Sequence, residues 1–161
     1  MLKILTVNQA IKEGERLSSD GKRIVLAGGC FDILHVGHII FLEKAKAAGD
    51  ALFVFLEADS RIKNIKGENR PFNTQGDRAK ILAALVSVDA IIKLPPDLTD
   101  QGYDYIVAKI KPDVLAATKG DPNRAHKERQ AKMIDARVIE VTDAISDKST
   151  SRLIKLLGKD L

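Results

Sequence analysis

One stretch of the chain decides its fold: Gly28-Gly29-Cys30-Phe31-Asp32-Ile33-Leu34-His35-Val36-Gly37-His38. It follows a mostly apolar run of strand length, Arg23–Ala27, and leads into residues 36–48, where apolar residues recur at helical spacing. Glycines at a strand end let the backbone approach a ligand closely. The N-terminus of the next helix offers free N–H groups and a partial positive charge. The stretch therefore predicts an anion-binding strand–turn–helix unit.

Two histidines lie at the start of this expected helix. His35 and His38 are three residues apart, so both imidazoles can project toward one point, and Gly37 between them adds no side chain that would crowd it. Two such donors would stabilise the negative charge of a transferring phosphoryl group. The pattern alone has two other interpretations: polar residues on an exposed first turn, or zinc ligands together with Cys30 and Asp32.

Apolar runs of strand length recur on both sides of this stretch and alternate with helical segments. They are residues 23–27, 51–56, 89–94, 114–117 and 136–141. This alternation predicts an α/β fold, a doubly wound five-stranded parallel sheet of Rossmann-like type with helices on both faces. Such sheets bind ligands in the crevice beyond the carboxyl ends of their strands.

Capping and stop signals bound the expected helices. A capping box at Thr6–Gln9 opens a leading helix that ends at Gly21, and Thr74 with Asp77 opens a helix over 74–87. Residues 59–73 are expected to form a polar loop. The remaining helices are expected at 36–48, at 103–110, from Asp121-Pro122 onward, and at 150–157.

Length and composition indicate one globular domain. The 161 residues, 45% hydrophobic and 30% charged, fit a single domain over 1–161, with residues 1–21 as a leading helix and linker. No apolar run is long enough to cross a bilayer, and the first residues lack a signal-peptide core. The single cysteine suits a reducing compartment. We therefore expect a cytoplasmic protein without a membrane partner.

The net charge of +4 does not point to nucleic acid. Lysines and arginines are scattered along the chain among acidic residues, and with two Tyr, five Phe and no Trp there is no evident platform for stacking bases. A modest basic excess instead suits small substrates that carry several negative charges. We expect small phosphorylated partners and no nucleic acid.

The chain resembles the cytidylyltransferase-like nucleotidyltransferases. Residues 30–38 resemble the family signature, together with Phe41-Leu42 and Ala45-x-x-x-Gly49-Asp50. Three more blocks match in order: Asp59 with Lys66-Gly67-x-x-Arg70-Pro71, Asp77-Arg78 and Val88-Asp89; Pro112-Asp113-Val114 with Lys119-Gly120-Asp121; and Ser149-Thr150-Ser151-Arg152. The resemblance implies a sheet order of 3-2-1-4-5 and transfer of a nucleoside monophosphate from a triphosphate to a phosphomonoester, with release of diphosphate.

Within the family, the chain resembles in particular the adenylyltransferase domain that acts on heptose 1-phosphate. The leading helix and the Lys66-Gly67-x-x-Arg70-Pro71 loop carry this likeness. A glycerol-3-phosphate-type cytidylyltransferase and a nucleotide-binding protein without turnover remain as alternatives. The resemblance further implies ATP or CTP as donor, Mg²⁺ held mainly by the phosphate oxygens of the triphosphate, a small phosphorylated acceptor, and a homodimer.

The resemblance also implies a set of site residues. His35, His38 and Lys66 would take part in catalysis. Residues near the nucleotide would be Gly29, Cys30, Phe31, Asp32, Gly37, Asp121, Ser149, Thr150 and Ser151. Residues near the acceptor or its phosphate would be Glu57, Asp59, Arg70 and Arg78.

Several of these residues have a second interpretation. Cys30 could be a small buried hydrophobe, Asp121 a helix cap, and Arg78 the partner of a carboxylate such as Asp89. Glu57 departs from the family pattern, because the resemblance leads us to expect asparagine there in heptose enzymes and serine in glycerol-phosphate enzymes. A carboxylate at that position would disfavour an anionic acceptor unless it is paired.

Overall fold

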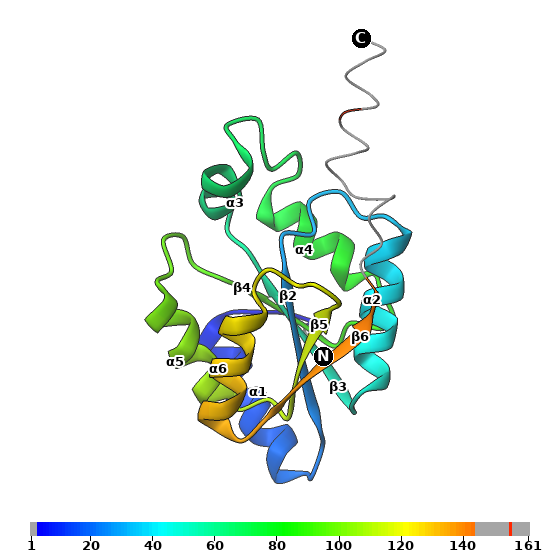
Figure 1. The fold of residues 1–161 in the computed structure, drawn as a ribbon, viewed down its shortest axis with the longest axis vertical. Coiled ribbons are helices and arrows are strands. Elements are labelled where there is room, and N and C mark those ends of the chain that lie inside the picture. The colour runs from blue at the N-terminus through cyan, green and yellow to red at the C-terminus, as the bar shows by residue number, and fades with distance from the viewer. Residues whose placement is uncertain (1–2, 144–154, 156–161) are drawn as a thin grey trace.

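The computed structural model describes residues 3–143 and 155, and over these residues it contains one six-stranded parallel sheet between two layers of helices (Figure 1). In chain order the elements are β1 (Ile4–Leu5), α1 (Val7–Ser19), β2 (Ile24–Gly29), α2 (Val36–Ala47), β3 (Ala51–Leu56), α3 (Asp59–Lys66), α4 (Gln75–Ala83), β4 (Ala90–Lys93), α5 (Asp100–Ile110), β5 (Val114–Thr118), α6 (Arg124–Ile134) and β6 (Arg137–Thr142).

The strand order is β1-β4-β3-β2-β5-β6, and every neighbouring pair is parallel. From β2 the chain winds first toward β3 and β4 and then returns to add β5 and β6 on the other side. The order therefore reverses between β2 and β5. In such a sheet the crevice for a ligand opens at this reversal, beyond the carboxyl ends of the strands.

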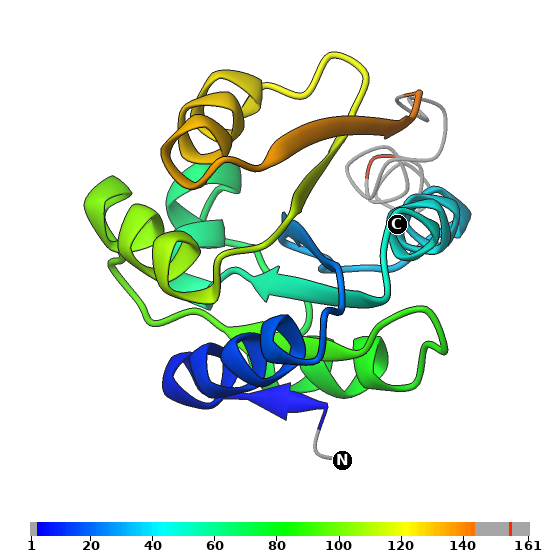
Figure 2. The same cartoon turned by 90° about the horizontal axis from the view of Figure 1, so that it is seen from below.

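The helices cover the two faces of the sheet in separate groups, as Figure 2 shows: α2 and α4 on one face, and α1, α5 and α6 on the other. On the first face Leu42 of α2 and Leu82 of α4 are fully buried among strand side chains. On the second face Ala10 of α1 and Ile110 of α5 are buried in the same way. All six residues of β3 are buried, as expected for a central parallel strand that is covered on both faces.

The α/β class and the doubly wound parallel sheet are confirmed, but the predicted strand count is wrong by one. The additional strand is β1, which pairs with β4 through Ile4 opposite Ile91 and Leu5 opposite Ile92. A strand of two residues has no alternating pattern from which it could have been predicted. The other five strands follow the order that the family resemblance implied.

The expected polar loop over 59–73 contains a helix, α3. Its only buried residue is Ile62, so the segment lacks the apolar periodicity by which a helix is identified in a sequence. In the same region α4 ends at Ala83, earlier than the predicted end at Ser87. The cap by Thr74 is as predicted, because its side chain accepts the N–H of Asp77.

Two further helix starts differ from the prediction. Thr99 caps α5, which therefore begins at Asp100 rather than at 103. α6 begins at Arg124, because Asp121 accepts the N–H of Asn123 in a turn that precedes the helix. The helix expected at 150–157 lies outside the described residues, apart from Lys155. Among the helices of the described part of the chain, none is long and apolar enough to cross a membrane.

Candidate active site

A pocket of about 580 Å³ opens at the carboxyl ends of β2, β3 and β5, where the strand order reverses. Its wall includes many of the residues that the sequence singled out, namely Gly29, Cys30, Phe31, His35, Gly37, His38, Glu57, Lys66 and Asp121. Asp32, Asp59, Arg70 and Arg78 lie behind this wall and do not line the pocket. Ser149, Thr150 and Ser151 lie outside the described residues.

The two histidines are held by the N-terminus of α2. His35 is the N-cap, and its Nδ1 accepts the N–H of Gly37 at 3.2 Å. The N–H of His35 in turn donates to Nδ1 of His38 at 3.3 Å. Because each Nδ1 accepts a hydrogen bond, the proton of each neutral ring lies on Nε2. With ring centroids 3.9 Å apart, the rings form a pair of N–H donors at the pocket wall.

The surroundings of these rings keep them uncharged at neutral pH. Burial, with smaller contributions from His35 and Lys66, lowers the pKa of His38 to about 4. Burial also lowers the pKa of His35. A neutral imidazole offers one N–H to a ligand oxygen, so the uncharged His38 ring presents a hydrogen-bond donor rather than a cation.

The ring of Phe31, in the turn after β2, packs against the ring of His38. Phe31 adopts a left-handed backbone conformation with φ of 45°, is 5% exposed, and its ring lies 5.4 Å from that of His38. A Cβ on Gly29 would lie only 3.0 Å from the Phe31 ring. A side chain at position 29 would therefore crowd the Phe31 ring, a reason for glycine that differs from the close approach of a ligand expected from the sequence.

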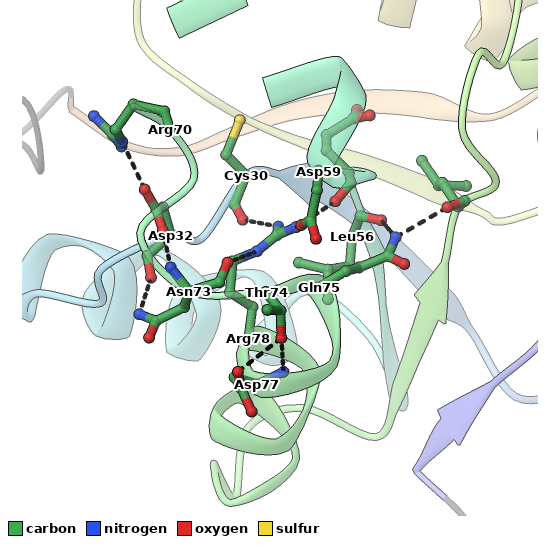
Figure 3. A network of polar contacts seen from close by, with 12 residues as sticks. Cys30, Asp32, Leu56, Asp59, Arg70, Asn73, Thr74, Gln75, Asp77 and Arg78 are labelled. Carbon is green, nitrogen blue, oxygen red and sulfur yellow. Dashed lines mark hydrogen bonds and ion pairs between the residues drawn. The ribbon is translucent and has the colours of Figure 1, made fainter. Parts of the chain in front are cut away.

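Asp32 joins the β2–α2 turn to the loop after α3, as Figure 3 shows. Its buried carboxylate accepts hydrogen bonds from Nε of Arg70 at 2.6 Å, from the N–H of Phe72 at 2.8 Å and from the N–H of Asn73 at 3.0 Å. Burial tends to raise the pKa of Asp32, but the bonds from Asn73, Phe72 and Arg70 together hold it below its usual value. The contacts give Asp32 and Arg70 a positioning role beneath the pocket.

Arg78 is a fully buried hub beneath the same wall (Figure 3). Its guanidinium donates to the carbonyls of Cys30, Glu57 and Asn73 and pairs with the carboxylate of Asp59 at 2.6 Å. The alternative partner suggested by the sequence, Asp89, pairs with Lys46 instead. Arg78 thus pairs with Asp59 and donates to backbone carbonyls. These contacts do not support the phosphate contact expected for Arg78.

The zinc interpretation of Cys30, Asp32, His35 and His38 is not supported by their geometry. Among residues 3–143 and 155, no group of three or more His, Cys, Asp or Glu side chains lies so that it could hold a metal ion. Both oxygens of the Asp32 carboxylate accept hydrogen bonds from protein groups. Burial, the largest influence, raises the pKa of the Cys30 thiol.

Lys66 and Asp121 bring opposite charges to the pocket. Lys66 is the last residue of α3 and lies close enough to His38 to contribute to its lowered pKa. Asp121 is paired with Lys127 at 2.6 Å, and Lys127 also donates to the carbonyl of Ala116 in β5. Asp121 is therefore held in one position beside the end of β5.

The sequence-based prediction missed Tyr103, Arg61 and Lys127, which also line the pocket. Tyr103 of α5 donates its hydroxyl hydrogen to Oε2 of Glu57 at 2.5 Å. It is one of only two tyrosines in the chain, at the start of a helix that follows a strand end. This position could have identified Tyr103 as a pocket residue, but only with the knowledge that α5 packs beside β3.

Comparisons with known proteins agree with this fold. A model of the cytidylyltransferase-like family matches residues 26–155. The bifunctional protein HldE of Aliarcobacter butzleri is 47% identical over 113 residues, which is 70% of this chain and 23% of that protein. HldE of Campylobacter fetus subsp. fetus is 37% identical over 152 residues, which is 94% of this chain and 31% of that protein. The chain thus spans less than a third of the length of these relatives.

Two solved structures share the architecture. A lipopolysaccharide core biosynthesis protein from Thermoplasma volcanium superposes with a TM-score of 0.63 at 27% identity, covering 77% of this chain and 99% of that one. Pantoate-beta-alanine ligase from Francisella tularensis, complexed with beta-gamma ATP and beta-alanine, gives a TM-score of 0.61 at 17% identity, covering 94% and 69%. The second likeness shows the fold alone. The family match, which spans the strands and turns of the pocket, places this chain in the cytidylyltransferase-like family.

Proposed function

We propose that the protein transfers the adenylyl group of ATP to a sugar phosphate of the heptose 1-phosphate type and releases diphosphate. The observation that carries this proposal is the pair of histidines at the start of α2, whose Nδ1 atoms both accept backbone N–H groups. That arrangement leaves two neutral Nε2–H donors at the wall of a pocket large enough for a nucleotide.

These donors suit the charge that develops during nucleotidyl transfer. The transition state at the α-phosphate carries negative charge on its equatorial oxygens, and preorganised donors in a site of low dielectric stabilise it. The N-terminus of α2 adds its own partial positive charge at the same place. We assign His38 the position nearer the α-phosphate, because it is the more deeply buried of the two rings.

The attacking group needs no strong base in this reaction. A phosphomonoester has a second pKa of about 6 and is already largely dianionic at neutral pH. Lys66 at the pocket wall can supply countercharge that brings this dianion next to the triphosphate. Cys30 is not proposed as a nucleophile, because burial raises the pKa of its thiol and direct in-line attack needs no covalent intermediate.

Magnesium would enter the site with the triphosphate. No cluster of side chains among the described residues could hold the ion by itself, so its ligands would be mainly phosphate oxygens, as is common for Mg²⁺ in nucleotide sites. When bound, the ion neutralises charge on the phosphates.

The proposed acceptor is inferred from the known proteins that the chain resembles. Likeness to the HldE proteins and to a protein of lipopolysaccharide core biosynthesis supports a carbohydrate phosphate as acceptor. A glycerol-3-phosphate-type cytidylyltransferase is the alternative within the same chemistry. A protein that binds nucleotide without turnover is the alternative outside it, and the intact set of His35, His38 and Lys66 speaks against that alternative.

The decisive experiment measures diphosphate release with magnesium, with each of the four common nucleoside triphosphates crossed with heptose 1-phosphate and glycerol 3-phosphate. We expect release with ATP and heptose 1-phosphate. His38→Ala should lower kcat by about 10²–10³ and change the Kd for ATP much less. Lys80→Ala, at an exposed position on α4 outside the pocket, is the control and should keep full turnover.

Other outcomes distinguish the alternatives. Release only with CTP and glycerol 3-phosphate would establish the cytidylyltransferase alternative. Nucleotide binding without release for any pair would indicate a binding protein. Near-normal turnover of His38→Ala would contradict the role given to His38.

A further inference from the structure

The pocket contains a second arrangement of polar groups, on the side of β3 and α5. Glu57 follows β3 directly, and its backbone is held on both sides: its N–H donates to the carbonyl of Gly29 at 3.2 Å, and its carbonyl accepts from Arg78 at 2.8 Å. Tyr103 fixes the side chain by donating to Oε2 at 2.5 Å. Among the described residues no donor contacts the other oxygen, Oε1, so one oxygen of a positioned carboxylate remains available in the pocket wall.

The charges around Glu57 limit what this oxygen could bind. A carboxylate disfavours the phosphate of an acceptor, because like charges repel. Burial, the largest influence, raises the pKa of Glu57, while the Tyr103 hydroxyl and the guanidinium groups of Arg61 and Arg78 favour its charged form, so the site already has cations near this carboxylate. A neutral donor fits best, and a hydroxyl that donates to a carboxylate forms a short and strong hydrogen bond.

Positive charge lies on the same pocket wall. Lys66 lines the pocket and acts on both His38 and the Cys30 thiol, and Glu57 also acts on Cys30. An acceptor that carries both a phosphate and hydroxyls would fit this wall, with the phosphate toward Lys66 and a hydroxyl toward Glu57.

We infer that Glu57, positioned by the Tyr103 hydroxyl, recognises a hydroxyl of the acceptor and makes the site selective for a polyhydroxylated phosphate ester. This inference rests on the proposed function and names the residue that determines acceptor specificity. It also accounts for a carboxylate at the end of β3 in a site that must admit an anion, because the carboxylate faces the uncharged part of that anion.

The test compares Glu57→Gln with the wild type, using heptose 1-phosphate and the series of its monodeoxy analogues with ATP and magnesium. In the wild type, loss of the contacted hydroxyl should raise KM for the acceptor by roughly 10- to 100-fold, as expected for a hydrogen bond to a charged group. Glu57→Gln should raise KM for heptose 1-phosphate by a similar factor with a much smaller change in kcat. In Glu57→Gln, replacing heptose 1-phosphate with the same deoxy analogue should not raise KM any further, because the variant and the analogue each remove the same hydrogen bond.

Tyr103→Phe tests the positioning role. It should raise KM for heptose 1-phosphate in the same direction but by less, and it should reduce the penalty for the same deoxy analogue. A tyrosine that only supported the fold would alter stability and leave the discrimination between acceptors unchanged. Glu43→Gln, at an exposed position on α2, is the matched control and should behave as the wild type.

Binding measured by calorimetry, with heptose 1-phosphate and a non-hydrolysable ATP analogue, separates this inference from the proposed function. Weaker binding by Glu57→Gln in a protein that shows no turnover would support the inference and contradict the proposed function. Turnover with an unchanged KM in Glu57→Gln, or a deoxy penalty as large as in the wild type, would overturn the inference and leave the proposed function standing.

Discussion

At the scale of single residues, the histidine pair shows how local geometry sets chemistry. Two residues three apart in sequence share one helix N-terminus, and the hydrogen bonds to their Nδ1 atoms choose the tautomer. Burial then lowers the pKa of His38 from 6.5 to about 4. In water this imidazole would gain and lose a proton near neutral pH, whereas in the folded chain it stays neutral there and can donate its N–H.

This lowered pKa has a consequence for stability that can be measured. Well above pH 6.5 the ring of His38 is neutral in both the folded and the unfolded chain and contributes no pH dependence. As the pH falls from 6.5 toward 4, the unfolded chain takes up the proton and the folded chain does not, so the free energy of unfolding decreases. Allowing for partial solvent access, we expect His38 to account for about 1–2 kcal/mol of this decrease.

Denaturant unfolding of the wild type and of His38→Gln at several pH values between 4 and 7 measures that contribution. The variant should show a shallower decrease, since glutamine has no proton to bind. His126→Gln, at an exposed position on α6, is the control and should keep the slope of the wild type. Equal slopes for the wild type and His38→Gln would show that His38 is not desolvated in the folded protein.

At the scale of elements, one arginine joins several segments that end at the pocket. Arg78, in the first half of α4, contacts the carbonyls of Cys30 after β2 and Glu57 after β3, and the carboxylate of Asp59 at the start of α3. These contacts fix the ends of the two central strands relative to each other. The pocket wall therefore depends on a side chain that does not touch the pocket.

Replacement of Arg78 by methionine should destabilise the protein by about 3–5 kcal/mol, because it leaves the carbonyls of Cys30, Glu57 and Asn73 without the buried guanidinium that donates to them. The free energy of unfolding in urea is the measurement. Lys80→Met, on the same helix but exposed, should change it by less than about 0.5 kcal/mol. If both variants unfold at the same urea concentration as the wild type, Arg78 does not have this structural role.

At the scale of the whole molecule, the leading segment is part of the core. β1 extends the sheet beside β4, and α1 packs on α5, where a Cβ on Gly14 would lie 3.0 Å from the carbonyl oxygen of Ile110. Leu5 and Ala10 are buried in the same apolar cluster as Ile110. Residues 3–21 therefore pack into the same core as the central strands and cover part of one face of the sheet.

Deletion of residues 1–21 should consequently prevent stable folding. The deletion removes Leu5 and Ala10, which are buried, and Val7, Ile11 and Leu17, which pack partly buried against the same cluster, so the lost apolar burial is comparable with the total stability of a domain. Circular dichroism during thermal unfolding should show no cooperative transition in the shortened chain. Lys12→Ala, on the exposed side of α1, should unfold like the wild type, and a shortened chain with the wild-type Tm would contradict this account.

Some structural features could be predicted from single segments of the sequence. The caps at Thr6 and Thr74 were correct because a cap depends only on residues within one turn. β1 and α3 were missed because a strand of two residues and a helix with one buried side chain have no periodic pattern. The start of α6 was misplaced because the side chain of Asp121 is used in a turn and by Lys127.

The sequence by itself determined the α/β class and the strand–turn–helix that holds His35 and His38, because these follow from periodicity, capping and spacing within short segments. It also contains the motifs through which the chain resembles its family. Only the tertiary structure decided which charged residues face the pocket. Arg78 and Asp32 are buried and form hydrogen bonds with backbone groups. Glu57 accepts a hydrogen bond from Tyr103, which lies 46 residues away in the sequence. Such pairings arise when the sheet and its helices pack, and no local pattern in the chain specifies them.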